Sequence, residues 1–99
     1  MNNPIEGLHK AFESRVKLGI MSILLVNEWV NYNDLKEYLE VTDGNLASHL
    51  KTLESNRFIE VRKQFLGRKP QTTYRATGEG REAFRKHLDA LEKLIRHKP

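Results

Sequence analysis

The sequence predicts a single, mainly α-helical domain with a small antiparallel sheet. Apolar residues recur at helical spacing at about residues 14–26, 32–55 and 77–96. Between the last two segments, residues 58–76 alternate apolar and polar side chains, as a half-buried hairpin does. A chain of 99 residues can bury one core of its own without crosslinks, so one domain over residues 1–99 is expected.

The first predicted element is an apolar helix. Leu8 to Phe12 form a short helical lead, after which Ser14 caps a helix that runs to about Val26. This helix is apolar on most sides in its second half. Some of its apolar surface must therefore be covered by another element besides the core. Residues 28–31 are expected to add a short strand beside the hairpin, and the first four and last three residues to fray.

A second amphipathic helix is expected to begin near Tyr32. Leu35 and Leu39 form its apolar stripe, which Tyr32 and Tyr38 flank, while the opposite face is charged. A tight turn over residues 40–42 then leads into another helix. Residues 32–55 are therefore predicted to be two short helices joined by a turn.

The helix after the turn is predicted to present a polar face. Thr42 can cap it, and its apolar residues fall on one stripe, which leaves outward residues that are nearly uncharged and rich in hydrogen-bonding groups. Such a face suits the base edges in the major groove of DNA. Gly44 either loosens the first turn or lets backbone amides approach a phosphate. The inward residues are Leu46, Leu50 and Leu53, and the outward ones are Gly44, Asn45, Ser48, Lys51, Thr52 and Ser55, with His49 on the flank.

The hairpin is strongly basic. Its strands are expected at residues 58–65 and 71–76, with a tip at residues 66–70. Between residues 57 and 75 there are six Lys or Arg against one Glu, a net charge of +5, whereas the whole chain carries +4 and the remainder therefore −1. A local basic region suits contact with phosphates. Cations on strands also protect sheet edges from aggregation, an alternative that explains Arg68 and Lys69 at the tip less well.

The last predicted element is a helix from Gly78 to about Arg96, capped by Thr77. Its apolar residues recur at spacings of four, three and four, like a coiled-coil seam. A homodimer through the first and last helices is favoured, with an isologous interface, over a monomer whose last helix folds back on its own core. The predicted interface residues are Leu8, Phe12, Phe84, Leu88, Leu91 and Ile95.

Several function classes are disfavoured. The chain has no cysteine, which excludes disulfides, thiolate metal sites and cysteine catalysis. No Gly-rich phosphate loop, nucleophile elbow or other catalytic constellation occurs, so neither an enzyme nor a cofactor is predicted. The longest apolar run, residues 18–26, is too short to span a bilayer, and no signal peptide precedes it, so a cytoplasmic protein without a membrane partner is expected.

The histidines do not predict a metal site. His9, His49, His87 and His97 match no compact ligand spacing, and His87 is expected to be partly buried and neutral. A site formed by histidine and carboxylate at the dimer interface is a less favoured alternative.

The chain resembles the compact winged-helix transcriptional regulators of the MarR and ArsR type, and particularly a minimal family of about this length. The resemblance runs from about Pro4 to Ile95 and is carried by residues 42–54, 58–63 and 72–81. It implies a winged helix-turn-helix with a long C-terminal dimerisation helix. The helix-turn-helix would span about 32–55, the wing about 58–76 and the C-terminal helix about 77–96.

The resemblance also implies roles for individual residues. The recognition helix of such proteins reads bases, and the wing contacts phosphate or minor groove. Base contacts are therefore expected from Asn45, Ser48, His49 and Thr52. Contacts to the DNA backbone are expected from Thr42, Gly44, Lys51, Arg62, Lys63, Arg68, Lys69 and Thr72.

The chain lacks one characteristic feature of each of the two types of regulator that it resembles. It lacks the cysteine pair of ArsR-type metal sensors, and it lacks most of the region against which MarR-type proteins bind phenolic ligands, so the existence of an effector stays open. The expected function is a homodimeric, sequence-specific regulator that binds double-stranded DNA, with repression inferred from small size and resemblance. A winged-helix protein-interaction module is the alternative. Structured RNA is a weaker option, because the aromatics that could stack on bases, Tyr32, Tyr38, Phe58 and Tyr74, all have core explanations.

Overall fold

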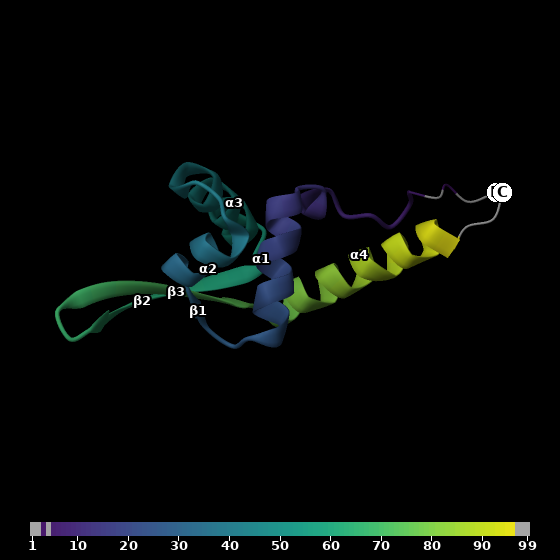
Figure 1. Cartoon of the computed structure of the whole chain (residues 1–99). Helices are drawn as coiled ribbons and strands as arrows, with labels where there is room; N and C mark the ends of the chain where they lie inside the picture. Colours follow the sequence, from purple (N-terminus) through teal and green to yellow (C-terminus); the bar gives the residue numbers. More distant parts are fainter. Residues whose placement is uncertain (1–2, 4, 97–99) are drawn as a thin grey trace.

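A hairpin and a long helix project in different directions from a group of three shorter helices (Figure 1). This computed structural model describes residue 3 and residues 5–96, so most of the two ends expected to fray, and His97, lie outside the described residues. The elements in chain order are η1 (Lys10–Phe12), α1 (Arg15–Val26), β1 (Val30–Asn31), α2 (Tyr32–Leu39), α3 (Asp43–Ser55), β2 (Ile59–Leu66), β3 (Lys69–Ala76) and α4 (Gly78–Arg96).

Polar caps start the helices where the sequence predicts them. The Ser14 hydroxyl accepts hydrogen bonds from the amides of Val16 and Lys17 and begins α1. The Thr42 hydroxyl accepts from the Asn45 amide at 3.2 Å, and the Thr77 hydroxyl accepts from the Gly80 amide at 2.9 Å. Each cap satisfies amides that lack a partner within the helix, which explains why these local signals were sufficient.

The three strands form an antiparallel sheet in the order β1, β3, β2. The predicted third strand is confirmed in a shorter form, pairing Val30 with Tyr74. The predicted five-residue tip is wrong, because Leu66 pairs with Lys69 and only two residues make the turn. Gly67 has a φ of +65°, the left-handed conformation that a two-residue hairpin turn requires at its first central position.

The core lies around α1. The side chains that are fully buried come from η1, α1, α2, α3 and α4, and the predicted inward stripe of α3 is confirmed. These fully buried residues are Phe12, Ile20, Met21, Leu24, Leu35, Leu46, Leu53 and Phe84. Tyr38 is an exception to the prediction, because 66 % of it is exposed rather than packed beside the apolar stripe of α2.

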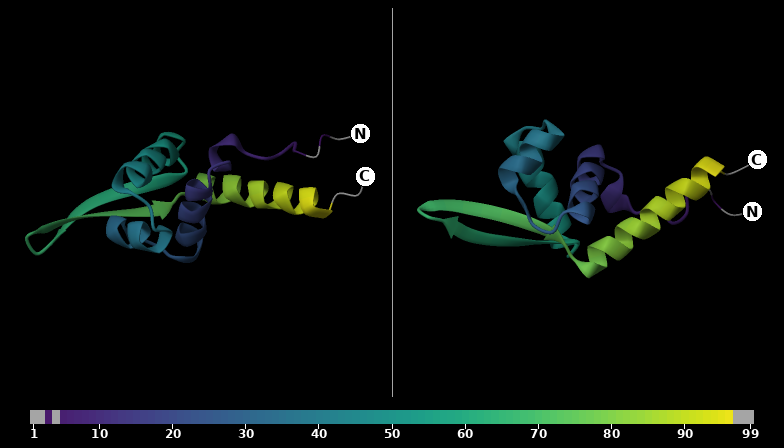
Figure 2. Two further views of the ribbon diagram at one scale, coloured as in Figure 1. Left: turned by 45° about the horizontal axis from the view of Figure 1, so that its top comes forward. Right: turned by 60° about the horizontal axis from the view of Figure 1, so that its bottom comes forward.

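The start of α4 is attached to the base of the hairpin. The Thr77 amide donates to the Phe58 carbonyl at 3.0 Å, and the Thr77 hydroxyl donates to the Arg57 carbonyl at 2.7 Å. A Cβ at Gly80 would lie 2.0 Å from the Phe58 carbonyl oxygen, so no larger residue fits without moving backbone. The direction in which α4 leaves the domain therefore depends on this contact (Figure 2).

The residues of α4 that are buried in the domain do not coincide with the predicted coiled-coil-like seam. Gly80, Phe84, His87 and Ala90 are buried, whereas Leu88 and Ile95 are 43 % and 83 % exposed. The buried side of α4 is the one that the N-terminal segment packs against, because the His9 amide donates a hydrogen bond to His87 Nδ1 at 2.9 Å. Within the described residues, no helix is both long and apolar enough to cross a membrane.

Candidate nucleic-acid interface

The outward face of α3 is polar and open to solvent. Asn45, Ser48 and Thr52, three of the four predicted base-contacting residues, are exposed at spacings of three and four and therefore lie on one face of the helix. Lys51 is exposed beside them. Among the described residues, the side chains of Asn45 and Ser48 have no hydrogen-bond partner, so their donors and acceptors remain available.

The fourth predicted base-contacting residue is placed differently. His49 is half-buried on the flank of α3, and its Nδ1 is buried without a hydrogen-bond partner among the described residues. Burial lowers the pKa of His49, and the nearby charge of Lys17 on α1 lowers it further. Its partial burial separates His49 from Asn45, Ser48 and Thr52, which are exposed. The sequence pattern placed it on the flank of α3, but only the tertiary packing decides how far it is buried.

Side chains of α2 hold the beginning of α3. The Tyr32 hydroxyl contacts both the carbonyl and the carboxylate of Asp43, and Lys36 Nζ lies 3.1 Å from the same carboxylate. The hydrogen bond from Lys36 is the main reason that the pKa of Asp43 is lowered. Glu40 takes a left-handed conformation that ends α2 and lets the chain turn at once. These contacts set the angle between α2 and α3. They also place the ammonium group of Lys36 beside the carboxylate of Asp43, the acidic group nearest to the polar face of α3.

The hairpin of β2, β3 and their turn, called the wing below, separates its cations onto two faces. Lys63 pairs with Thr72 on one face, and Arg62 pairs with Thr73 on the other. The Arg62 guanidinium lies 4.2 Å from the centre of the Trp29 ring, a cation–π contact. Arg62 is therefore engaged at the base of the wing, which differs from its predicted role as a free phosphate contact.

Three other cations of the wing are freely exposed. Lys63, Arg68 and Lys69 project near or at the turn. Arg75 instead forms an ion pair with Glu60, the only acidic residue of this region, and also lies over Trp29. The positive charge that is free to meet a polyanion is thus concentrated toward the tip.

Trp29, Phe65 and Leu66 were not among the predicted site residues. Trp29 anchors two arginines at the base of the wing, and its neighbours in sequence gave no sign of this role. Phe65 and Leu66 are 71 % and 60 % exposed next to the turn. Two large apolar residues directly before Gly67 in a basic hairpin were the signal that could have identified them.

Comparison with known proteins identifies this combination of helix-turn-helix and basic hairpin. Residues 16–95 match a family described as winged helix DNA-binding domain. The chain belongs to this family. It is a DNA-binding transcriptional regulator with a winged-helix fold, and the prediction that it is not an enzyme is confirmed.

Relatives of this winged-helix regulator cover nearly its whole length. It is 36 % identical over 88 residues to "Uncharacterized protein MJ0432" of Methanocaldococcus jannaschii. The aligned region covers 89 % of this chain and 96 % of the relative. A transcriptional regulator homologue from Pyrococcus horikoshii OT3 is 30 % identical with a TM-score of 0.72, covering 87 % of this chain and 90 % of that one. A MarR-family structure from Porphyromonas gingivalis W83 has a TM-score of 0.69 at 19 % identity, covering 90 % and 85 %. The expected MarR-like resemblance is confirmed, while none of these relatives is described as of the ArsR type.

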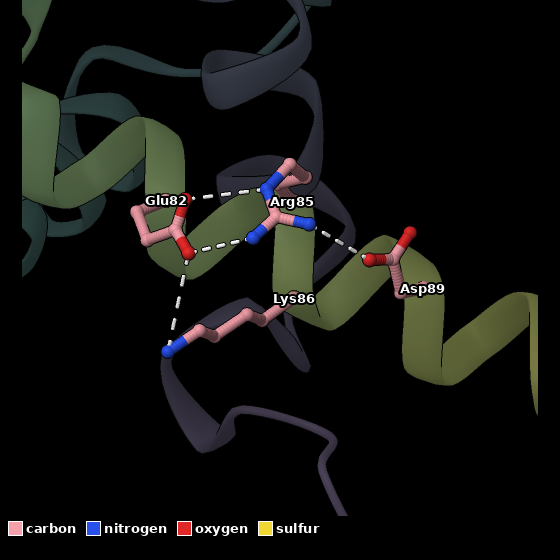
Figure 3. Close-up of polar contacts among 4 residues, drawn as sticks. All are labelled: Glu82, Arg85, Lys86 and Asp89. Carbon is pink, nitrogen blue, oxygen red and sulfur yellow. Dashed lines mark hydrogen bonds and ion pairs between the residues drawn. The ribbon is translucent and has the colours of Figure 1, made fainter.

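The residues predicted for the dimer interface of the winged-helix regulator fall into two groups. Phe12 and Phe84 are buried in the core of one chain, which leaves no free surface on them for a partner. Leu8 and Leu91 are half-buried, and Leu88 and Ile95 are exposed. The side of α4 that carries Glu82, Arg85, Lys86 and Asp89 is covered by ion pairs within the helix (Figure 3). An apolar partner could therefore meet α4 along its Leu88, Leu91 and Ile95 side rather than along this charged one.

Proposed function

We propose that this winged-helix regulator binds a specific double-stranded DNA sequence as a homodimer and represses transcription there. The observation that carries the proposal is the outward face of α3 beside a cationic wing. Asn45 and Ser48 offer uncharged donors and acceptors there, and Thr52, whose hydroxyl donates to the Ser48 carbonyl, offers an acceptor. Asparagine and hydroxyl side chains make base-specific hydrogen bonds in the major groove. A protein-binding version of this surface would be expected to expose apolar residues on α3 instead.

The contacts divide into two kinds. Asn45, Ser48 and Thr52 read bases, whereas Thr42, Gly44 and Lys51 at or beside this face contact phosphates with their backbone amides or side chains. Lys63, Arg68, Lys69 and Thr72 contact the backbone or the minor groove from the wing. Arg62 joins them only if it leaves Trp29.

The homodimer is proposed to form through α4. Leu88 and Ile95 are exposed along its free side, and Leu91 beside them is half-buried. A two-fold dimer presents two copies of α3 to half-sites about 34 Å apart on one side of the duplex. Repression requires only that such a dimer occupies a promoter, and a cytoplasmic location follows from that role.

The test begins with selection of bound duplexes from a random pool, followed by titration of the recovered sequence and a scrambled duplex. Fluorescence anisotropy at low and moderate salt is expected to show tighter binding of the recovered sequence and a steep loss of affinity with salt. Sedimentation of the wild-type chain and of Leu88→Glu/Ile95→Glu is expected to show a dimer and a monomer. Absence of binding to any duplex at low salt would contradict the proposal and favour a protein-interaction module.

A further inference from the structure

The tip of the wing exposes apolar surface that none of the described residues covers. Phe65 and Leu66 are 71 % and 60 % exposed, although Phe65 is paired with Pro70 and Leu66 with Lys69 at the end of the sheet. The tip of the hairpin extends beyond the helices (Figure 1). Exposed apolar residues at the end of a hairpin favour aggregation unless a partner covers them.

The charges around these two residues indicate the chemistry of that partner. Lys63, Arg68 and Lys69 are exposed on either side of the apolar pair. Between Val61 and Gly78 the sequence contains no Asp or Glu. The tip therefore fits a polyanion that has an apolar interior between its charged edges. The minor groove of a DNA duplex has this form, with phosphates on both walls and stacked bases between them.

The orientation of the hairpin agrees with a duplex bound by α3. Phe65 shares a face of β2 with Val61, whose cross-strand partner is Tyr74. Nearer the base of the hairpin this face is packed on the core, because Tyr74 packs against the core and the pair Ile59 and Ala76 is buried. Phe65 thus lies on the face that packs on the helices at its base, and Leu66, the next residue, lies on the opposite face of the tip.

The wing is also long enough to reach the next groove. Each of its strands has eight residues, which at about 3.3 Å per residue corresponds to a hairpin of about 26 Å. The minor groove next to a major groove lies about half a helical turn away, or about 17 Å. With α3 in the major groove, the tip can therefore meet the flanking minor groove.

We propose that Phe65 and Leu66, on the two faces of the tip, form an apolar wedge that enters this minor groove end-on, partly unstacks a base step and bends the duplex. Apolar side chains that enter the minor groove act on DNA in this way. Arg68 and Lys69 hold the phosphates on the groove walls. The wedge rests on the proposed function and adds a consequence to it: the regulator prefers easily unstacked pyrimidine–purine steps beneath the tip, where it makes no base-specific hydrogen bond.

An anionic membrane is the other polyanion that a basic tip with an aromatic residue could meet. The duplex is favoured because the wing belongs to a winged helix DNA-binding domain, in which α3 carries an exposed polar face. Binding to vesicles is included below as a competing outcome.

The experiment uses the selected duplex with a dye at each end and 2-aminopurine at the step beneath the tip. Wild type is expected to increase energy transfer between the dyes and to raise 2-aminopurine fluorescence. Phe65→Ser/Leu66→Ser is expected to lose both signals and to bind about tenfold more weakly with an unchanged salt slope. Phe65→Met, which keeps an apolar side chain, is expected to retain most of the bend.

Two control variants separate the wedge from other effects. Val26→Ser alters an apolar residue that is 81 % exposed on α1 and is expected to behave like wild type. Arg68→Ala/Lys69→Ala is expected to reduce the salt slope, which the wedge variant does not. Because all of these side chains are exposed, circular dichroism should show the same fold throughout.

Three results would overturn the wedge. If the serine variant bends the duplex as wild type does, the wedge is wrong while the proposed function stands. If the serine substitutions leave DNA binding intact but abolish binding to phosphatidylserine vesicles, the apolar tip serves a membrane. If wild type binds no duplex, the proposed function fails and the wedge fails with it.

Discussion

Helix α3 and the tip of the wing, the two regions proposed to contact DNA, are held in the molecule in opposite ways. Leu46, Leu50 and Leu53 fix α3 in the core, so the positions of its outward side chains are set by the whole domain. The tip has only its own strand pairing, and both of its apolar residues are exposed. A fixed face suits hydrogen bonds to base edges, which demand exact placement, whereas a projecting tip suits a groove whose width varies.

Replacing Gly80 should have the largest effect, because it disturbs the junction between the wing and α4. A Cβ there would lie 2.0 Å from the Phe58 carbonyl oxygen, and in Gly80→Ala the backbone must move. We expect the free energy of unfolding to fall by about 1–3 kcal/mol, measured by urea denaturation. Gly78→Ala is the matched control, since nothing lies within 4 Å of a Cβ at that position. Equal stability of the two variants would show that the junction is not tight.

Substitutions on α3 should separate base contacts from phosphate contacts. Asn45→Ala or Ser48→Ala should weaken binding to the selected duplex by about 1–3 kcal/mol and binding to random duplexes very little. Both side chains are exposed, so stability should not change. Fluorescence anisotropy with both duplexes measures the difference. An equal loss on the two duplexes would assign these residues to the backbone.

Substitutions at the tip should produce the opposite pattern. Arg68→Ala/Lys69→Ala should weaken binding to every duplex alike and reduce the slope of log affinity against log salt by roughly 1 to 2 units. Arg62→Ala is the informative comparison, because this guanidinium lies over Trp29 rather than toward the tip. Its effect on the salt slope should be smaller. A slope unchanged by the double substitution would remove the tip from the DNA interface.

The pH dependence of stability should reflect His87, which lies in α4, outside both regions proposed to contact DNA. Burial lowers the pKa of His87, His9 lowers it further and Glu13 opposes the change. Below the ordinary value of 6.5 the unfolded chain therefore binds more protons than the folded one, so stability is full above that pH and decreases as the pH falls. One histidine contributes at most about 1.4 kcal/mol for each pH unit. His87→Gln should reduce the slope of urea stability between pH 7.5 and 5.5, leaving the part that His49 contributes.

Gly44→Ala should have the smallest effect on stability, and it should increase it. Gly44 lies in the first turn of α3, and nothing lies within 4 Å of a Cβ there. We expect a gain of about 0.5–1 kcal/mol from the better helix former. If the backbone of this turn approaches a phosphate, DNA affinity should fall in the same variant. A gain in stability with no loss of affinity would favour the interpretation of Gly44 as a loose first turn.

The accuracy of the sequence-based predictions differed between the two regions proposed to contact DNA. In α3, the Thr42 cap and the leucine stripe depend on residues three or four positions apart, so periodicity alone was sufficient. In the wing, the strands were predicted but the length of the tip was not. That length depends on the φ of Gly67 and on pairing across the hairpin.

The sequence by itself determined the order of the elements, the helix caps, the polar face of α3 and the basic character of the wing. These features are local, because they follow from hydrogen bonds and side-chain spacing within a few residues. Only the tertiary structure decided that His49 is half-buried, that Arg62 lies over Trp29, and that Phe12 and Phe84 are buried within one chain. Burial and stacking of this kind depend on which distant segments meet, and that is decided when the helices pack around α1.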